Sequence, residues 1–185
     1  RNLKTMEFSL TDMTANLEKG KILGSVFVKN FENPEIDMEL DANFNLDFLA
    51  GFLNLEDIKD ASGSIKLKMK FHDIIDLDNP EYTLKDLNQA YFSELKIQDL
   101  HFASSSLPAT LEQLDMHIIM NGKKADIDQF DIKLGKSDLS LTGYLSDLPA
   151  IVHHTKIPVT AHIDMKSNVL DITELTKFSK KDSTG

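Results

Sequence analysis

The sequence contains no cysteine, which removes disulfide bonds, cysteine-ligated zinc and thiol catalysis together. This absence leaves the compartment open, because cysteine-free proteins occur both in the cytosol and in the bacterial periplasm. No stretch approaches the ~20 consecutive apolar residues that a membrane-spanning helix needs. Acidic residues outnumber basic ones, with 30 Asp and Glu against 20 Lys and Arg, so the formal net charge is -10 at pH 7. We therefore expect no nucleic-acid partner and no electrostatic attachment to anionic membranes, since both require basic patches.

The amino-acid composition is typical of a soluble globular protein. The chain has 185 residues, of which 41% are hydrophobic and 27% are charged. A domain of about this length buries roughly 70% of its unfolded surface. The chain begins at Arg1 without an initiator methionine, so we interpret it as a piece of a longer protein. We expect any signal peptide or membrane tether to lie outside this piece.

The clearest local pattern is the strict alternation of polar and apolar residues from Glu35 to Phe44. A period of two predicts a strand with one apolar and one polar face. A short helix is predicted next, with Asp47 as its cap and apolar residues at helical spacing. Alternation returns from Ser64 to Phe71. The polar residues are acidic in the first strand and mostly basic in the second, so the two strands are predicted to pair antiparallel. The predicted helix carries these apolar residues: Phe48, Leu49, Phe52 and Leu53.

Period-two patterns recur along the rest of the chain and predict nine or ten strands. Asn121-Gly122 is the strongest hairpin signal. A change of parity near Asp99, and another between Ile127 and Phe130, each predict a β-bulge. The predicted fold class is all-β or β-dominated, with a curved, mainly antiparallel sheet of repeated strand units, groove-like or sandwich-like, and a few short helices.

Segments outside these strands receive simpler predictions. The pattern gives a polar stretch from residue 11 to 20 with a turn at Gly20, a loop over 72–85 and a connection over 149–158. A short helix is predicted over 169–178, and residues 179–185 are predicted to be a disordered tail.

The strand patterns repeat weakly. Pro34 to Asp47 reads as a strand, a Leu-Asp step and a short helix, and Pro158 to Asp171 reads in the same way. We therefore predict one β-rich domain over 1–178 with two related units, about 1–71 and 92–178. Repeated units of this kind stack and share one apolar face.

Two runs of residues carry a family resemblance. The first is Phe31 to Leu40, continued by Leu46-Asp47 and Ser62 to Ile65, and the second is Phe130 to Leu145. They combine apolar alternation with Asn-Pro, a Gly-x-Ser-Asp turn and a strand that ends at glycine. This sequence resembles the AsmA-like family of Gram-negative envelope proteins over most of residues 1 to 175.

The resemblance implies a periplasmic domain that is tethered to the inner membrane and takes part in outer-membrane biogenesis. Longer members of the family form open β-grooves that carry phospholipid between membranes. The resemblance therefore implies phospholipid or another acyl-chain lipid, together with other envelope proteins, as partners. The pattern contains no catalytic residues, so none is carried over to this chain.

No group of residues in the sequence has the composition and spacing of a catalytic or metal-binding site. His153-His154 lies in a connection without a placed carboxylate, which is poor spacing for a metal. The acidic stretch from Asp73 to Glu81 lacks the glycine and the terminal glutamate of an EF-hand loop. Neither a nucleophile elbow nor a phosphate loop is present. We expect no catalytic activity, no cofactor and no functional metal.

Two interpretations of the apolar strand faces stay open. Either they form a groove for acyl chains, or they are sealed as the core of a structural or protein-interaction module of the envelope. Alternation shows that a face is apolar, and not what covers it. The residues predicted to face lipid are Leu40, Phe44, Leu67, Met69, Leu141 and Ile163. The residues predicted to close the groove end, from two short helices, are Phe48, Phe52, Ile172 and Leu175.

Overall fold

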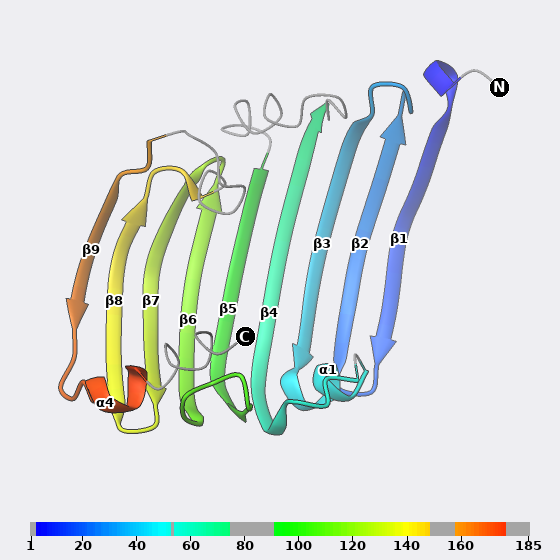
Figure 1. The fold of residues 1–185 in the computed structure, drawn as a ribbon. Helices are drawn as coiled ribbons and strands as arrows, with labels where there is room; N and C mark the ends of the chain where they lie inside the picture. The colour runs from blue at the N-terminus through cyan, green and yellow to red at the C-terminus, as the bar shows by residue number, and fades with distance from the viewer. Residues whose placement is uncertain (1–2, 53, 75–90, 149–157, 177–185) are drawn as a thin grey trace, which may run out of the picture.

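The described part of the chain folds as a single open β-sheet. A computed structural model describes residues 3–52, 54–74, 91–148 and 158–176. Nine strands follow one another across the sheet in chain order, and each is antiparallel to its neighbours (Figure 1). This confirms the predicted β-dominated, mainly antiparallel fold class, and the described residues form one open sheet and not two packed sheets. The strands are β1 Glu7–Leu17, β2 Gly20–Lys29, β3 Glu35–Asn45, β4 Lys59–Ile74, β5 Tyr91–Ala103, β6 Leu111–Asn121, β7 Lys124–Leu134, β8 Ser137–Leu145 and β9 Ala161–Lys166.

The predicted pairing of β3 with β4 is confirmed. The two strands are antiparallel neighbours in a register that places Glu39 opposite Lys70 and Asp41 opposite Lys68. The Lys70 ammonium lies 2.7 Å from the Glu39 carboxylate. Opposite charges on directly facing residues favour this register over its alternatives by roughly 0.2–1 kcal/mol per pair.

The predicted hairpin and bulges are also found. Asn121 and Lys124 pair across a two-residue turn whose first residue, Gly122, has a φ of 60°. The β5–β6 register shifts between Ile97 and Leu100, where Asp99 has a φ of 51°. The β7–β8 register shifts between Ile127 and Phe130. These shifts keep the apolar residues of neighbouring strands on one face.

The prediction for residues 11–20 was wrong. Strand β1 continues to Leu17, and Gly20 begins β2 instead of forming the turn. The reason is a bulge at Thr11 and Asp12, with a φ of 54° at Asp12, which resets the alternation in the second half of β1. After the bulge, apolar residues again face the same side of the sheet, although most of the intervening side chains are polar.

The two short helices that lie within the described residues are at the same end of the sheet, the lower end in Figure 1. Helix α1 spans Leu46–Phe52 and packs against β3 and β4. Asp47 therefore lies in the first helical turn and does not precede the helix, although its carboxylate accepts a hydrogen bond from the Phe48 amide at 2.8 Å. Helix α4 spans Ile172–Leu175, so it begins three residues later than predicted. A 3-10 turn, Leu3–Thr5, precedes β1.

Some predictions fall outside the described residues. The loop prediction over 72–85 is wrong at its start, since β4 continues to Ile74, and residues 75–90 are not described. The connection over 149–158 and the tail over 179–185 lie almost wholly outside the described ranges. The division into two repeated units stays a prediction.

Candidate functional site: the apolar face of the sheet

The register aligns the apolar residues into rows that cross the whole sheet. Alternate side chains of a strand point to opposite faces, so residues that pair in sequence from β1 to β9 share one face. Three neighbouring rows can be followed from edge to edge, and we name each after one member. In β1-to-β9 order, the Leu40 row is Met13, Gly24, Leu40, Met69, Ser93, Met120, Ala125, Leu145 and Ala161. In the same order, the Leu67 row is Ala15, Ile22, Ala42, Leu67, Leu95, Ile118, Ile127, Gly143 and Ile163. The Phe44 row is Leu17, Gly20, Phe44, Ile65, Ile97, Met116, Phe130, Leu141 and Met165.

Every position of these rows is apolar or glycine except Ser93. The rows are consecutive, because Leu40, Ala42 and Phe44 are alternate residues of one strand. Together they form a continuous apolar surface that spans all nine strands, which we call the apolar face.

All six residues predicted to face lipid lie on the apolar face. Leu40 and Met69 are directly opposite each other on β3 and β4. The other four fall into the two adjoining rows: Leu67 and Ile163 share one, and Phe44 and Leu141 share the other. These six residues do not form one compact cluster. Strands β5, β6 and β7 separate the four on β3 and β4 from Leu141 on β8 and Ile163 on β9.

The residues in the middle of the apolar face were not among those predicted from the sequence to face lipid. It is built by β5, β6 and β7 and includes Leu95, Ile118 and Ile127 in one row. The sequence pattern places each of these residues on an apolar strand face. What was missing was the register across the bulges, which shows that they join the two predicted groups into one surface.

The apolar face is only half-buried. Within its three rows, Ala42, Ile97, Met120 and Ala125 are buried, and the remaining side chains are partly or fully exposed. Neighbours within a single sheet can cover the sides of a residue but not its top. Partial burial over so many apolar residues is therefore the pattern of a sheet without a second layer over the described part of this face.

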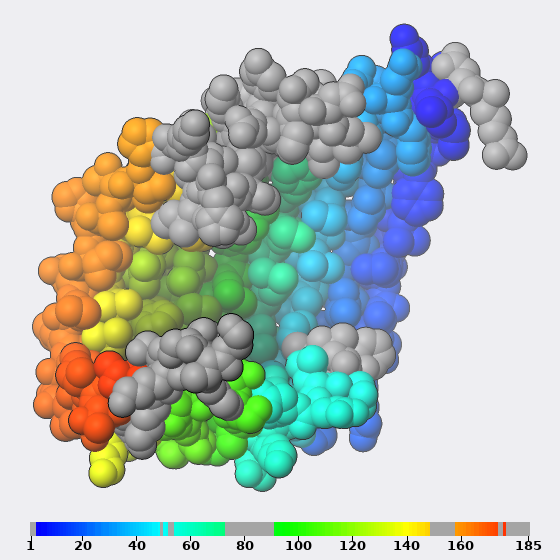
Figure 2. All heavy atoms as spheres, viewed as in Figure 1, coloured from blue at the N-terminus to red at the C-terminus, as the bar shows by residue number. Residues whose placement is uncertain are grey.

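A compact core lies at the end of the sheet that carries the helices. Leu46 of α1 packs with Ile97, Leu100 and Leu111 in a buried cluster. Helix α1 thus covers the lower end of the apolar face. Figure 2 shows this side of the molecule, with α1 (cyan) and α4 (red) at its lower rim and a hollow over the middle strands.

Of the four residues predicted to close the groove end, the structure describes the side chains of only two. Phe48 is half-buried in α1, and Ile172 is 57% exposed in α4. The side chains of Phe52 and Leu175 lie outside the described part of the chain, although both residues belong to the two helices. The helices do lie at one end of the sheet, as expected (Figure 1).

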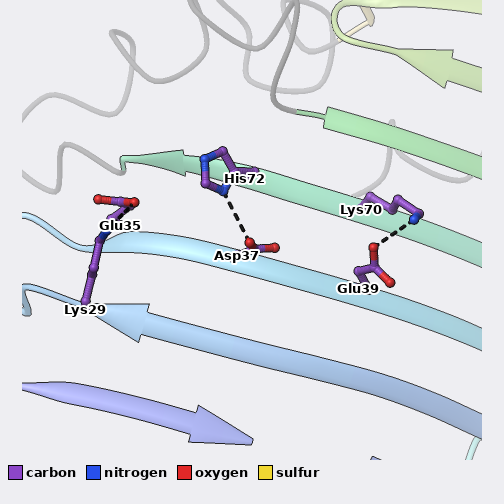
Figure 3. A network of polar contacts seen from close by, with 6 residues as sticks. All are labelled: Lys29, Glu35, Asp37, Glu39, Lys70 and His72. Carbon is purple, nitrogen blue, oxygen red and sulfur yellow. Dashed lines mark hydrogen bonds and ion pairs between the residues drawn. The ribbon is translucent and has the colours of Figure 1, made fainter. Parts of the chain in front are cut away.

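The opposite face carries the charges. Figure 3 shows ion pairs on this face between neighbouring strands, at 2.7 Å for Lys29 with Glu35 and 3.5 Å for His72 with Asp37. A shallow trough of about 520 Å³ crosses β1 to β5 on this face between two rows of polar-face residues. Four residues of the Leu40 row also line it: Met13, Gly24, Leu40 and Met69. The side chains along the trough are Thr14, Leu23, Ser25, Glu39, Asp41, Lys68, Lys70 and Phe92.

A histidine between two carboxylates also lies on the polar face. His117 Nε2 is 3.0 Å from Glu94, and Nδ1 is 3.3 Å from Asp128. Both ring nitrogens are therefore engaged, and no hydroxyl or thiol nucleophile takes part in these contacts. The described residues contain no group of three or more histidine or acidic side chains arranged to hold a metal ion. The pair His153-His154 and the residues from Asp76 to Glu81 lie outside the described ranges.

Two aspartates join the loops at the lower end of the sheet. The Asp138 carboxylate accepts hydrogen bonds from the amides of Asn168 and Val169 at 2.7 and 2.8 Å. These bonds, with those from the Asn168 and Ser167 side chains, lower the pKa of Asp138 to about 2. Asp57 is held in the same way. Hydrogen bonds from Ser104, Ser105 and Ser106 hold its pKa well below the usual range.

No helix among the described residues is both long and apolar enough to cross a membrane. Comparisons of the chain with protein-family models, with curated protein sequences and with solved structures found no match.

Proposed function

We propose that the chain is a non-catalytic, lipid-handling module of an AsmA-like envelope protein. In this proposal it resides in the periplasm, is tethered to the inner membrane in the full-length protein, and serves outer-membrane biogenesis. Its ligand is a phospholipid or another acyl-chain lipid, and its protein partners are other envelope proteins.

The apolar face is the observation that carries the proposal. A single sheet exposes an apolar surface on one side and a charged surface on the other, and the described residues supply no second layer. Such extended apolar surfaces are rare on soluble proteins and mark binding sites for lipids or other apolar partners. A sealed structural core needs a covering layer, so the half-exposed face favours the groove.

The dimensions of the face fit an acyl chain. Strand β3 has 11 residues, which at ~3.4 Å per residue rise about 37 Å. One leaflet of a bilayer has a hydrocarbon thickness of about 15 Å. A lipid tail can therefore lie along the strands, and each methylene that leaves water contributes about 0.8 kcal/mol.

Binding is tested by titration of the delipidated protein with a fluorescent fatty acid. We expect saturable binding by the wild type. Met69→Glu and Ile118→Glu, which place a carboxylate on the apolar face, should weaken it at least about tenfold, because a charge there loses its hydration beside a lipid tail. Gln98→Glu is the matched control, since it adds the same charge to an exposed position of β5 on the polar face.

Circular dichroism establishes that each variant is folded before it is titrated. Mass spectrometry of an organic extract of the freshly purified protein identifies the lipid class. A folded wild type without saturable binding and without extractable lipid would contradict the proposal and favour the structural or protein-interaction module. An equal loss of fatty-acid affinity in Gln98→Glu and Met69→Glu would show that the apolar face is not the lipid-binding site.

A further inference from the structure

Strand β9 is an exposed edge of the open sheet. It pairs with β8 on one side, and no described strand lies on its other side. All six of its residues are exposed, and Met165 has 67% of its surface accessible. An edge strand carries main-chain N–H and C=O groups ready to pair with a further strand.

The two edges of the sheet differ in how open they are to pairing. At the other edge, β1 is interrupted by the bulge at Thr11 and Asp12, a feature that discourages strand addition. The β8–β9 register runs without a shift from Ser140 opposite Lys166 to Leu145 opposite Ala161. Strand β9 therefore offers an uninterrupted edge.

We propose that β9 pairs antiparallel with β9 of a second copy of this chain and forms a two-fold symmetric dimer. Directly opposed residues of antiparallel strands lie on the same face, so only registers that match apolar with apolar residues are allowed. The register centred on Ile163 places Ile163 opposite its own copy and Ala161 opposite Met165 on the apolar face. On the polar face it places His162 opposite Asp164 twice.

Charge complementarity selects this register. The neighbouring register centred on Asp164 would oppose the two Asp164 carboxylates, which is unfavourable because like charges repel. Within the described chain, Asp164 faces Thr142 of β8 and forms no ion pair there. The rings of His162 and Tyr144 have centroids 4.8 Å apart, and in this register a ring N–H of His162 can donate to the Asp164 carboxylate of the second copy.

The dimer would join two nine-stranded sheets into one. A two-fold axis perpendicular to the sheet keeps both apolar faces on the same side, so the apolar surface also becomes continuous. The contact is confined to one short strand from each copy. We therefore expect a weak dimer that forms at micromolar and higher protein concentrations. The inference does not depend on what the apolar face binds.

The test is sedimentation velocity of the wild type and of charge variants over a concentration series. His162→Asp opposes two aspartates twice in the dimer and should weaken it about tenfold or more. Asp164→Lys removes both attractive pairs and should also weaken it. The double variant with His162→Asp and Asp164→Lys opposes Asp with Lys and should restore the dimer. Both positions are exposed, so these variants are expected to stay folded.

A matched pair of edge variants locates the interface. Met165→Lys adds a charge to the β9 edge and should abolish the dimer, whereas Leu10→Lys adds the same charge to β1 and should leave it intact. A wild type that stays monomeric at every concentration would overturn the proposal and leave β9 to a strand of another protein. A dimer that Leu10→Lys disrupts, or one that the double charge variant does not restore, would overturn the interface or its register.

Discussion

At the residue scale, Gly143 determines whether β9 can join the sheet. Its φ is 142°, a conformation that residues with side chains rarely adopt. A Cβ at this position would lie 2.0 Å from the carbonyl oxygen of His162, and that oxygen belongs to the backbone of β9. Strand β8 can thus approach β9 closely only because residue 143 has no side chain.

Gly143→Ala should therefore detach β9. We expect a loss of roughly 2 kcal/mol or more of stability, because the clash adds to the backbone strain. Hydrogen exchange should show lost protection of the amides between Ala161 and Lys166, with β3 to β6 unaffected. Gly51→Ala is the control, since a Cβ at Gly51 of α1 meets nothing within 4 Å. It should be neutral or stabilising by up to about 1 kcal/mol. Unchanged protection of β9 in Gly143→Ala would show that the sheet can adjust to the added methyl group.

At the element scale, Asp138 ties the segment after β9 to the start of β8. Its amide donates to the carbonyl of Val169 at 2.9 Å, while its carboxylate accepts from the Val169 amide. The buried hydroxyl of Ser137 accepts from the amide of Asp171 at 3.0 Å. These bonds hold residues 167–169 in a non-helical, bent connection, which explains why α4 begins at Ile172 and not at Val169.

This attachment should depend on pH. The pKa of Asp138 is lowered from 3.8 to about 2 in the folded protein, so ionised Asp138 stabilises the fold above pH 3.8. The contribution is lost as the pH falls through about 2. Asp138→Asn should release residues 167–169 at every pH, since an amide cannot accept the same set of bonds. NMR protection of the Asn168 and Val169 amides between pH 5 and about pH 1 measures both effects, since the range must extend below the lowered pKa. Glu7→Gln, a neutralised and exposed acid of β1, should leave these amides unchanged; equal protection in Asp138→Asn would contradict the assignment.

The elements also show what could be predicted from sequence. The β3–β4 pair was predictable because its alternation is unbroken and its charges are complementary. The second half of β1 was not, since the bulge at Asp12 reverses the parity within a mostly polar stretch. All six residues predicted to face lipid lie on the apolar face. Their distance from one another could not be predicted, because it follows from the strand order, which places β5, β6 and β7 between the residues of β3 and β4 and those of β8 and β9.

At the scale of the whole molecule, the sheet resembles one half of a sandwich. Only eight hydrophobic residues among the described ones are buried, and no described side chain above alanine size is fully buried. Stability must then come largely from the ladder between strands and from lateral contacts within the apolar face. Ordinary domains are stabilised mainly by the removal of apolar surface from water, and here that removal is incomplete until something covers the apolar face.

This incomplete burial should be visible in the heat capacity of unfolding. Globular proteins average about 12–15 cal/mol/K per residue, or about 2.2–2.8 kcal/mol/K for a chain of this length. We expect a value clearly below this range for the delipidated protein, because its apolar face is already hydrated before unfolding. Addition of a bound fatty acid should raise both the melting temperature and the heat capacity change, since the ligand covers the face in the folded state only. Differential scanning calorimetry with and without the lipid measures both quantities, and the Met69→Glu variant serves as the control that lipid should stabilise much less at the same concentration. A delipidated protein within the average range, with no response to lipid, would show that the apolar face is sealed in solution.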